Sequence, residues 1–368
     1  MRAFLFSLLR FCWNIPRRFY FYSARFSLKR SSAAEPVLSF GEVLDRQTHP
    51  HGGAVKLLTL KRSFLTNQRE FNILYLVSSA QPPFALDLLA RARQRGIAFV
   101  WNQNGVAYRA WAAQDVELHN APMRLLHQMA DYVIYQSAFS RDCAQHFLGA
   151  SQAPSQILFN PIDLDVFAPL PVRPPLQPLR LLTLGTHGYR ARVLSTLACL
   201  KCLQEAGTPA LLTLAGQCQW PNAHRELQEE IASLGLQSLV TLLPAFTQAQ
   251  AVTLYQSHHL LLHPKYLDPS PTVVLEALSS GCPVVGSATG GLPELVSKES
   301  GVLIPAALQW DQMITPTGEE LAAGVLKILP HFSSYAQAAR QRAELLFNKE
   351  EWIAGHRAIF AACLSRKI

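Results

Sequence analysis

Two acids that suit ligand binding lie eight positions apart in the stretch LDPSPTVVLEALSSGCPVVGSATGGLPELV, Leu267 to Val296. Glu276 lies inside the apolar helical pattern VVLEAL, and Asp268 precedes this helix in a proline-containing loop. A carboxylate suits two neighbouring hydroxyls, as on a ribose, because charge-assisted hydrogen bonds are stronger than neutral ones. The alternative is structural, with Glu276 as an exposed or N–H-bonded acid and Asp268 as a turn residue.

Paired glycines precede two of the expected helices. Gly290-Gly291 comes before a helix predicted to begin near Leu292, and Gly52-Gly53 comes before another. The free N–H groups and the positive dipole end of a helix bind phosphate, and glycine allows the backbone to approach closely. Glycines are common before helices, so each pair alone is a weak signal.

From Val37 onward, short apolar runs alternate with helical patterns, which predicts α/β domains built on parallel sheets. Residues 169–178 contain five prolines and are predicted to be an extended linker, because proline continues neither a helix nor a central strand. The linker separates an N-terminal domain, residues 36–168, from a C-terminal domain, residues 179–346. Ligands bind at the carboxyl ends of such strands, so the glycine pairs are expected to face each other across a cleft.

The net charge of +8 is concentrated at one end of the chain. Residues 1–34 contain seven arginines and lysines and no acid, so the rest of the chain carries +1 (8 − 7). A nucleic-acid-binding domain would spread its basic residues over the folded surface. The charge distribution therefore argues against a nucleic-acid partner.

Residues 1–35 combine these cations with aromatic and aliphatic side chains. At about 100° per residue, Arg10 and Arg17 fall on one side of a helix and Leu8 falls on the other. This division is typical of a helix that lies in an anionic membrane surface, and the apolar run ends at Pro16, too soon to span a bilayer. The alternatives are a helix packed on the protein itself and an organelle transit peptide.

Together these features resemble a known signature. Asp268, seven residues and Glu276, followed by SGCPVVGSATGG and LPEL, resemble the donor site of the retaining glycosyltransferases of the GT-B fold, called glycosyltransferase group 1 or family 4. The segments YVIYQSAFS and ILFNPIDLDVFAP are similar to the end of that family's first domain, and VLSF with HPHGGAVKLL is similar to its N-terminal glycine loop. The resemblance covers residues 37–365 and is strongest in 263–296.

The resemblance implies an α/β fold of GT-B architecture, in which two doubly wound Rossmann-like domains face a cleft. It implies that Glu276 binds the donor ribose and that Asp268 lies near the hydroxyls of the transferred sugar. A helix in residues 347–368 would cross back to the N-terminal domain. The donor diphosphate would be bound by the backbone of four residues, Thr289, Gly290, Gly291 and Leu292.

The basic pair of the family is altered in this chain. After the first strand of the second domain, Gly185, expected on the donor side, is followed by Thr186 where the family has an arginine. Arg190 or Arg192 would then be the catalytic cation on the leaving diphosphate. Asp268 is also shorter than the glutamate that the family usually has at its position.

The first domain departs from the family pattern as well. The histidine often found after its third strand is absent from VWNQNGVAY. Asn102, Gln103 or Asn104 would take its place on the acceptor side, near the N-terminal glycine loop at Gly52 and Gly53.

The sequence therefore predicts a retaining glycosyltransferase that transfers a sugar from a nucleotide diphosphate sugar to a hydroxyl of a glycan or glycolipid acceptor. The expected setting is cell-envelope polysaccharide or glycolipid synthesis, with a cytoplasmic enzyme held peripherally on the inner face of the cell membrane. Neither a metal nor a cofactor is expected. The alternatives are a nucleotide-sugar epimerase of the same fold and a non-catalytic protein that binds a sugar nucleotide or a glycan.

Overall fold

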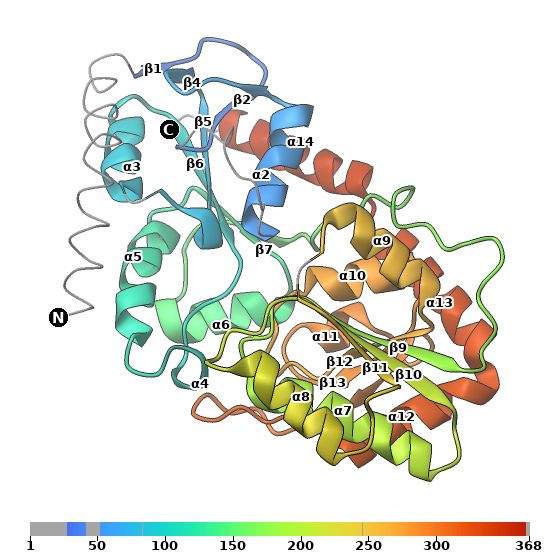
Figure 1. Ribbon diagram of the computed structural model, residues 1–368. Helices are drawn as coiled ribbons and strands as arrows, with labels where there is room; N and C mark the ends of the chain where they lie inside the picture. The colour runs from blue at the N-terminus through green and yellow to red at the C-terminus, as the bar shows by residue number, and fades with distance from the viewer. Residues whose placement is uncertain (1–27, 42–51, 83, 245, 366–368) are drawn as a thin grey trace.

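The computed structural model describes residues 28–41, 52–82, 84–244 and 246–365. These residues form two α/β domains, the first at upper left and the second at lower right in Figure 1. Each domain is built on a sheet of six parallel strands. The predicted fold class, two Rossmann-like domains, is confirmed.

The N-terminal domain has the strand order β3-β2-β5-β6-β7-β8. Its strands are β2 Val37–Ser39, β3 Leu65–Thr66, β5 Ile73–Val77, β6 Ala98–Gln103, β7 Tyr132–Tyr135 and β8 Ser155–Ile157. Its helices are α2 Gly52–Ser63, η2 Ser78–Ala80, α3 Ala85–Gln94, α4 Arg109–Ala112, α5 Val116–Gln128 and α6 Ala138–Leu148. The order reverses between β2 and β5, and doubly wound sheets bind ligands at such a point.

The start of the described chain belongs to this domain. Strand β1, Lys29–Arg30, pairs with β4, Glu70–Phe71, and Leu28 is buried in the domain core. The N-terminal domain therefore begins earlier than predicted, before the boundary that was placed after residue 35. The predicted membrane helix falls in residues 1–27, outside the described residues. None of the helices described has both the length and the apolar character needed to cross a bilayer.

The C-terminal domain has the strand order β11-β10-β9-β12-β13-β14, which reverses between β9 and β12. Its strands are β9 Leu179–Leu184, β10 Ala210–Ala215, β11 Val240–Leu243, β12 Leu260–His263, β13 Val284–Ser287 and β14 Gly301–Ile304. Its helices are α7 Arg190–Glu205, α8 Ala223–Ser233, α9 Gln248–Ser257, α10 Thr272–Ser279, α11 Leu292–Leu295, α12 Gly318–Ile328, η3 Leu329–His331 and α13 Phe332–Leu346.

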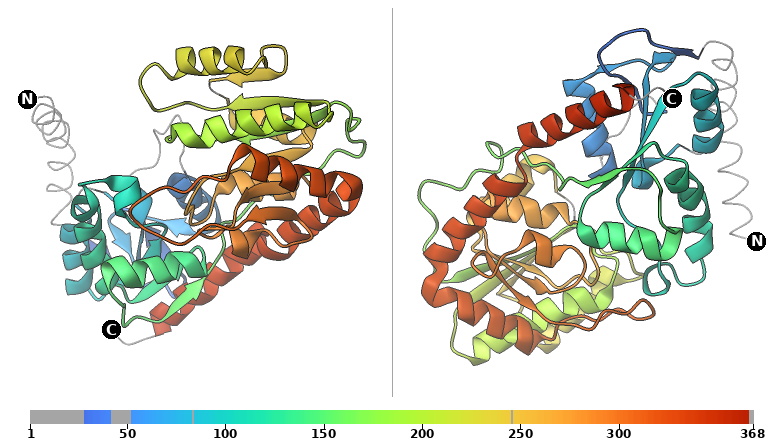
Figure 2. Two further views of the ribbon diagram at one scale, coloured as in Figure 1. Left: turned by 90° about the horizontal axis from the view of Figure 1, so that it is seen from below. Right: turned by 180° about the vertical axis from the view of Figure 1, so that it is seen from behind.

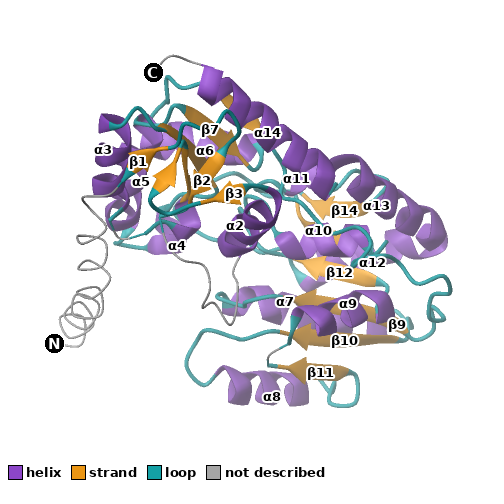
Figure 3. Cartoon of the chain, turned by 90° about the horizontal axis from the view of Figure 1, so that it is seen from above, coloured by secondary structure: helices purple, strands orange, loops and turns teal. Residues whose placement is uncertain are grey.

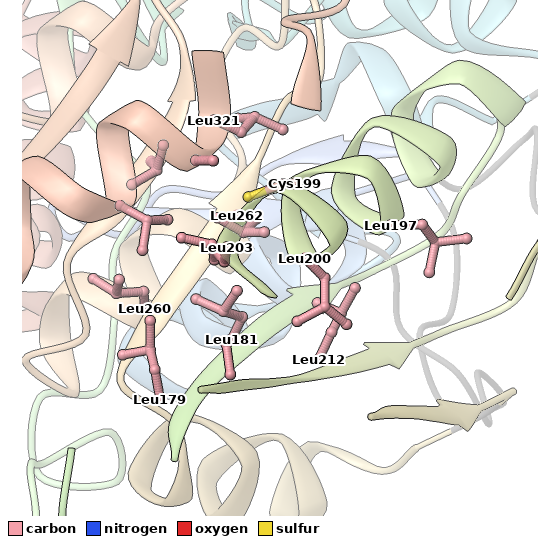
Figure 4. Packing of buried hydrophobic residues seen from close by; sticks show 14 of the residues in the cluster. Leu179, Leu181, Leu197, Cys199, Leu200, Leu203, Leu212, Leu260, Leu262 and Leu321 are labelled. Carbon is pink, nitrogen blue, oxygen red and sulfur yellow. The ribbon is translucent and has the colours of Figure 1, made fainter. Parts of the chain in front are cut away.

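Leucine-rich strands form the core of the C-terminal domain. Strands β9 and β12 read LRLLTL and LLLH, and such continuous apolar runs are typical of parallel strands covered on both faces. Helices α7 and α12 cover one face, where Cys199 and Leu203 lie close to Leu181 and Leu262 (Figure 4). Helices α9, α10 and α13 cover the other face. This packing fixes the positions of the carboxyl ends of β9 and β12.

Two segments connect the domains and lie side by side. The proline-rich stretch 169–178 contains neither helix nor strand. Before it, the Ile162 N–H donates to the Phe347 carbonyl (2.8 Å), which joins the outgoing segment to the returning one. Helix α14, Lys349–Ser365, then packs Trp352 and Phe360 against the N-terminal sheet (Figures 2 and 3). The C-terminal helix thus holds the two domains together.

Candidate active site

Polar side chains converge at the carboxyl ends of β9 and β12, where the strand order of the C-terminal domain reverses. His187 lies in the segment after β9, and Arg192 lies in the first turn of α7. His263 is at the end of β12, and Lys265 and Asp268 lie in the loop that follows it.

Arg192 is the buried cation of this group, and its side chain is fixed by the backbone. Its guanidinium donates from Nη1 to the carbonyl of Thr186 and from Nη2 to that of Leu184, both at 3.2 Å. Burial lowers the pKa of Arg192 to about 10, and the nearby Asp268 carboxylate opposes this shift. Arg192 is therefore charged at neutral pH. Its Nε–H has no hydrogen-bond partner among the described residues.

Arg190 lies two positions earlier but is placed differently. Its side chain is 57% exposed, and its Nε forms an ion pair with Glu226 (3.0 Å). Of the two arginines predicted as alternatives, only Arg192 is held at the end of β9. The structure therefore corrects the inclusion of Arg190 among the catalytic candidates.

Asp268 is the buried anion of the group. Its Oδ2 lies 2.8 Å from Lys265 Nζ and 3.6 Å from His263 Nε2. Burial by itself would raise the pKa of Asp268, but Lys265 and His263 outweigh it and hold the pKa well below its ordinary value. Asp268 is therefore ionised at neutral pH.

The group as a whole is positively charged and contains unpaired nitrogens. Burial lowers the pKa of His187 to about 3 and that of His263 to about 4, so both rings are neutral. Within the described chain, His187 Nδ1 and both ring nitrogens of His263 lack hydrogen-bond partners. A buried polar atom left unpaired costs about 1–3 kcal/mol. Two cations, one anion and several unpaired nitrogens suit an anion rich in oxygen atoms, such as a diphosphate.

Glu276 lies on α10, half-buried, and has a different set of neighbours. The Tyr255 hydroxyl donates to its Oε2 (2.9 Å), and burial raises the pKa of Glu276 to about 7. Its Oε1 has no hydrogen bond to any described residue, so this oxygen is free to accept one from a ligand. Gly185 lies beside the start of α10, since a Cβ added to it would be 3.5 Å from Val273 Cγ1.

The glycine pair Gly290-Gly291 brings two loops together. A Cβ at Gly290 would lie 2.4 Å from the carbonyl oxygen of Asp268, and the Gly291 N–H already donates to that oxygen (2.8 Å). Thr289 Oγ1 accepts a hydrogen bond from a backbone N–H of the loop that contains Asp268 (3.0 Å). Leu292 is fully buried, and α11 consists of a single turn. The prediction that this backbone binds a diphosphate is therefore wrong for the Gly291 N–H, which already has a partner.

Glu294, in the same turn, connects the two domains. Its carboxylate accepts hydrogen bonds from the N–H groups of Ala138 (2.7 Å) and Phe139 (2.9 Å) at the start of α6. Next to them, the Ser137 hydroxyl donates to the Pro269 carbonyl (2.8 Å). An acid of the C-terminal domain thus caps a helix of the N-terminal domain.

A cavity of about 550 Å³ lies between the domains. The segments after β5 and β6 and the start of α6 form its N-terminal wall, and the loop after β12 forms its C-terminal wall. Clefts of this size, mostly apolar with a few polar groups, are typical of small-ligand sites. The residues that line it include Ser79, Tyr108, Trp111, Phe139, Lys265 and Leu267.

The asparagines predicted for the acceptor side lie behind this cavity. Asn102 and Gln103 are buried, and Asn102 Oδ1 accepts a hydrogen bond from Lys56 Nζ (3.3 Å). Asn104 Oδ1 accepts another from Lys56 (2.6 Å), and its Nδ2 donates to Ser79 Oγ (2.6 Å), which belongs to a residue of the cavity wall. Asn104 therefore supports the wall, whereas Asn102 and Gln103 are interior residues and not acceptor contacts.

Three residues that sequence analysis missed take part in these arrangements: Lys56, His263 and Lys265. Lys265 follows the apolar run LLLH by two positions, a signal that places it at the carboxyl edge of a strand. Gly52 and Gly53 begin α2, but the loop before them, residues 42–51, lies outside the described residues. Their acceptor role stays a prediction.

The described residues contain no group of three or more His, Cys, Asp or Glu side chains that could hold a metal ion. The sequence contains one Asp-x-Asp string, Asp163-Leu164-Asp165. Asp163 forms an ion pair with Lys349 (2.7 Å) where the chain crosses between the domains. This string therefore has a structural partner.

Comparison with known proteins connects the C-terminal domain to one family. Residues 173–315 match the family model described as glycosyl transferases group 1, and this range includes Arg192, Asp268 and Glu276. A D-inositol 3-phosphate glycosyltransferase of Mycobacteroides abscessus is 35% identical over 80 residues, 22% of this chain and 18% of the relative. The chain thus matches less than a fifth of the length of this relative.

Solved structures resemble nearly the whole chain. Anabaena HepE, in complex with UDP-glucose, superposes with a TM-score of 0.66 at 16% identity, covering 89% of this chain and 99% of the other. Sucrose-phosphate synthase from Thermosynechococcus elongatus superposes with a TM-score of 0.63 at 18% identity, covering 84% and 77% of the two chains. At these identities the likeness establishes the fold, in which two Rossmann-like domains face a cleft.

Proposed function

We propose that this chain, whose residues 173–315 form a group 1 glycosyltransferase domain within a GT-B fold, is a glycosyltransferase that uses a nucleoside diphosphate sugar. The observation that carries the proposal is the buried Arg192, with an unpaired Nε–H, near the Asp268 carboxylate that pairs with Lys265, where the strand order reverses. A protein that needed only a stable core would not require a buried arginine at a sheet edge, because burying a charge is costly.

Each candidate residue has a role that follows from its surroundings. Glu276 binds the ribose hydroxyls through its free Oε1. Arg192 and Lys265 bind the diphosphate, whose negative charge balances the cation that Asp268 alone leaves uncompensated. Asp268, fixed beside Lys265, accepts hydrogen bonds from hydroxyls of the sugar. The relatives support this donor class, since HepE has been solved with UDP-glucose.

In the proposed reaction, the bond between the anomeric carbon and the phosphate oxygen breaks, and the acceptor oxygen bonds to that carbon. The proton of the acceptor hydroxyl passes to the leaving diphosphate, so charge and atoms balance. Negative charge grows on the diphosphate in the transition state, where Arg192 and Lys265 stabilise it. The transfer retains the anomeric configuration, as the resemblance to family 4 implies.

The proposed acceptor is a glycan or glycolipid, bound in the apolar cavity between the domains at an anionic membrane. The cationic residues 1–27 support this location, and the apolar lining supports an acceptor with an apolar part. Deletion of residues 1–27 is expected to abolish co-sedimentation with anionic vesicles at low salt and to leave UDP affinity unchanged, as measured by calorimetry. Undiminished sedimentation of the shortened protein would contradict the membrane role.

The donor class is tested by incubating the protein with a panel of nucleoside diphosphate sugars. One donor is expected to raise the melting temperature and to be converted to free nucleoside diphosphate when an acceptor extract is added. NMR of the product reports the anomeric configuration. An epimerase would change the sugar without any acceptor, and a non-catalytic protein would bind the donor without turnover; either result would contradict the proposal.

A further inference from the structure

Lys56 is a buried lysine that the proposed transfer does not use. Its side chain is 3% exposed, and its Nζ lies within hydrogen-bond distance of three amide oxygens. These are the side-chain oxygens of Asn104 (2.6 Å), Gln136 (3.1 Å) and Asn102 (3.3 Å). Three acceptors match the three N–H groups of an ammonium, whereas a neutral amine has only two. The geometry therefore serves the charged form.

No neighbouring acid among the described residues would balance a charge on Lys56. No described carboxylate forms a hydrogen bond or an ion pair with its Nζ. Two titratable groups are connected to it through Asn102: Tyr75 of β5, whose hydroxyl accepts from Asn102 (2.8 Å), and His356 of α14, which bonds to Tyr75 (3.0 Å). Burial raises the pKa of Tyr75 and lowers that of His356 to about 3, so both groups are neutral at pH 7.

Burial without an acid lowers the pKa of Lys56 to about 7. The folded protein therefore disfavours the very form for which the three oxygens are arranged. An unpaired buried charge is costly unless an opposite charge is supplied. The position of Lys56 indicates where in the cleft a ligand would supply the opposite charge.

Lys56 lies directly behind the wall of the cavity. The N-terminal sheet reverses its strand order between β2 and β5; α2, which carries Lys56, follows β2, and Ser78 and Ser79 follow β5 (Figure 1). Asn104 joins them, since it bonds to Lys56 on one side and to Ser78 Oγ and Ser79 Oγ on the other. Both serines line the cavity. One layer of polar side chains thus separates the ammonium from the cavity.

The same network reaches the C-terminal domain. Gln136 Oε1, bonded to Lys56, also accepts from Asn160 Nδ2 (3.1 Å), which lies 3.1 Å from Ser270 Oγ just before α10. Asn160 Oδ1 is buried and has no hydrogen-bond partner in the described part of the chain. Lys56 is therefore connected both to the cavity wall and to the donor side of the cleft.

We infer that the cleft binds a phosphate group close to the N-terminal domain and that Lys56 is the cation that balances its charge. This inference rests on the proposed function, and the phosphate belongs either to the donor diphosphate or to a phosphorylated acceptor. On phosphate binding, a neutral Lys56 takes up one proton from solution and becomes the ammonium for which its three oxygens are arranged. Lys56 acts here as a positioning residue through its charge.

The test is calorimetric titration at pH 7.5 in two buffers with different ionisation enthalpies, which reports proton uptake. In the donor arm, UDP is compared with uridine. In the acceptor arm, glucose 6-phosphate is compared with glucose in the presence of saturating UDP. In at least one arm, Lys56→Met is expected to weaken binding of the phosphorylated probe about tenfold and to abolish the additional proton uptake. The probes without phosphate, uridine and glucose, should bind unchanged.

A second variant keeps the inference testable if Lys56→Met does not fold. Asn104→Asp keeps the shape of the side chain and places a carboxylate beside Lys56, so it should also abolish the proton uptake. Lys201→Met, which removes a partly exposed lysine of α7, is the matched control and should behave as wild type.

The arm that responds identifies the source of the phosphate. Equal phosphate affinity and equal proton uptake in wild type and both test variants would overturn the inference while leaving UDP binding, and so the proposed function, intact. Failure of wild type to bind UDP and every other nucleoside diphosphate of the donor panel would overturn the proposed function and this inference with it.

Discussion

Arg192→Met is expected to lower turnover about 10²–10³-fold at saturating donor, a loss typical of removing one preorganised donor to a developing anion. The guanidinium is buried at the end of β9 and keeps an unpaired Nε–H, so it meets the leaving diphosphate without first being reorganised. Because negative charge grows in the transition state, affinity for the nucleoside diphosphate should fall far less than turnover. Turnover is measured as release of nucleoside diphosphate, and affinity by calorimetry.

The control for this prediction lies on the same helix. Arg190→Met removes an equal charge that is largely exposed and paired with Glu226, and it should leave turnover within about twofold of wild type, as surface ion pairs contribute little. Arg192→Lys should recover part of the activity, which a purely structural arginine would not predict. Full activity in Arg192→Met, with loss in Arg190→Met, would contradict the assignment.

Glu276→Ala is expected to lower affinity for the nucleoside diphosphate about a hundredfold or more. Two hydrogen bonds to a charged carboxylate contribute about 1.5–3 kcal/mol each, and every 1.4 kcal/mol is a factor of ten. Tyr255→Phe removes only the hydroxyl bonded to Oε2 and should cost less than about tenfold. Asp268→Asn should spare affinity for the nucleoside diphosphate and reduce transfer.

The raised pKa of Glu276 adds a pH signature to this prediction. Below a pKa of about 7 the acid is protonated and accepts weaker hydrogen bonds, so affinity for a nucleoside should rise between pH 6 and pH 8. A nucleoside is the right probe because it carries no phosphate that titrates. Glu276→Gln should remove the pH dependence. A pH-independent wild type, or the same slope in the glutamine variant, would argue against a ribose contact.

Hydrophobic periodicity was sufficient to predict most elements of the fold, but not all of them. Buried parallel strands such as β5, ILYLV, are continuous apolar runs that local sequence reveals. Strand β14 and helices α12 and α13 were not predicted from the sequence. Helix α12 does carry a local signal, the capping box of Thr317 and Glu320, whereas β14 is a four-residue strand with two half-buried positions. Such a short strand is stabilised by its neighbour β13 more than by its own pattern.

Parts of the site were harder to predict because they depend on contacts between distant segments. The spacing of Asp268 and Glu276 was visible locally. The Gly291 N–H was predicted to bind phosphate because sequence alone does not reveal that this N–H already donates to the Asp268 carbonyl of another loop. Lys56 was missed because its partners lie 46, 48 and 80 positions away in the chain. Only the folded sheet brings those amides around one ammonium.

A crystal structure with bound UDP tests the central claim most directly. The account predicts the ribose hydroxyls within hydrogen-bond distance of Glu276 and the diphosphate against Arg192 Nε and Lys265, at the carboxyl ends of β9 and β12. A nucleotide bound in the N-terminal domain, or a diphosphate held at Gly290-Gly291 away from Arg192, would contradict it.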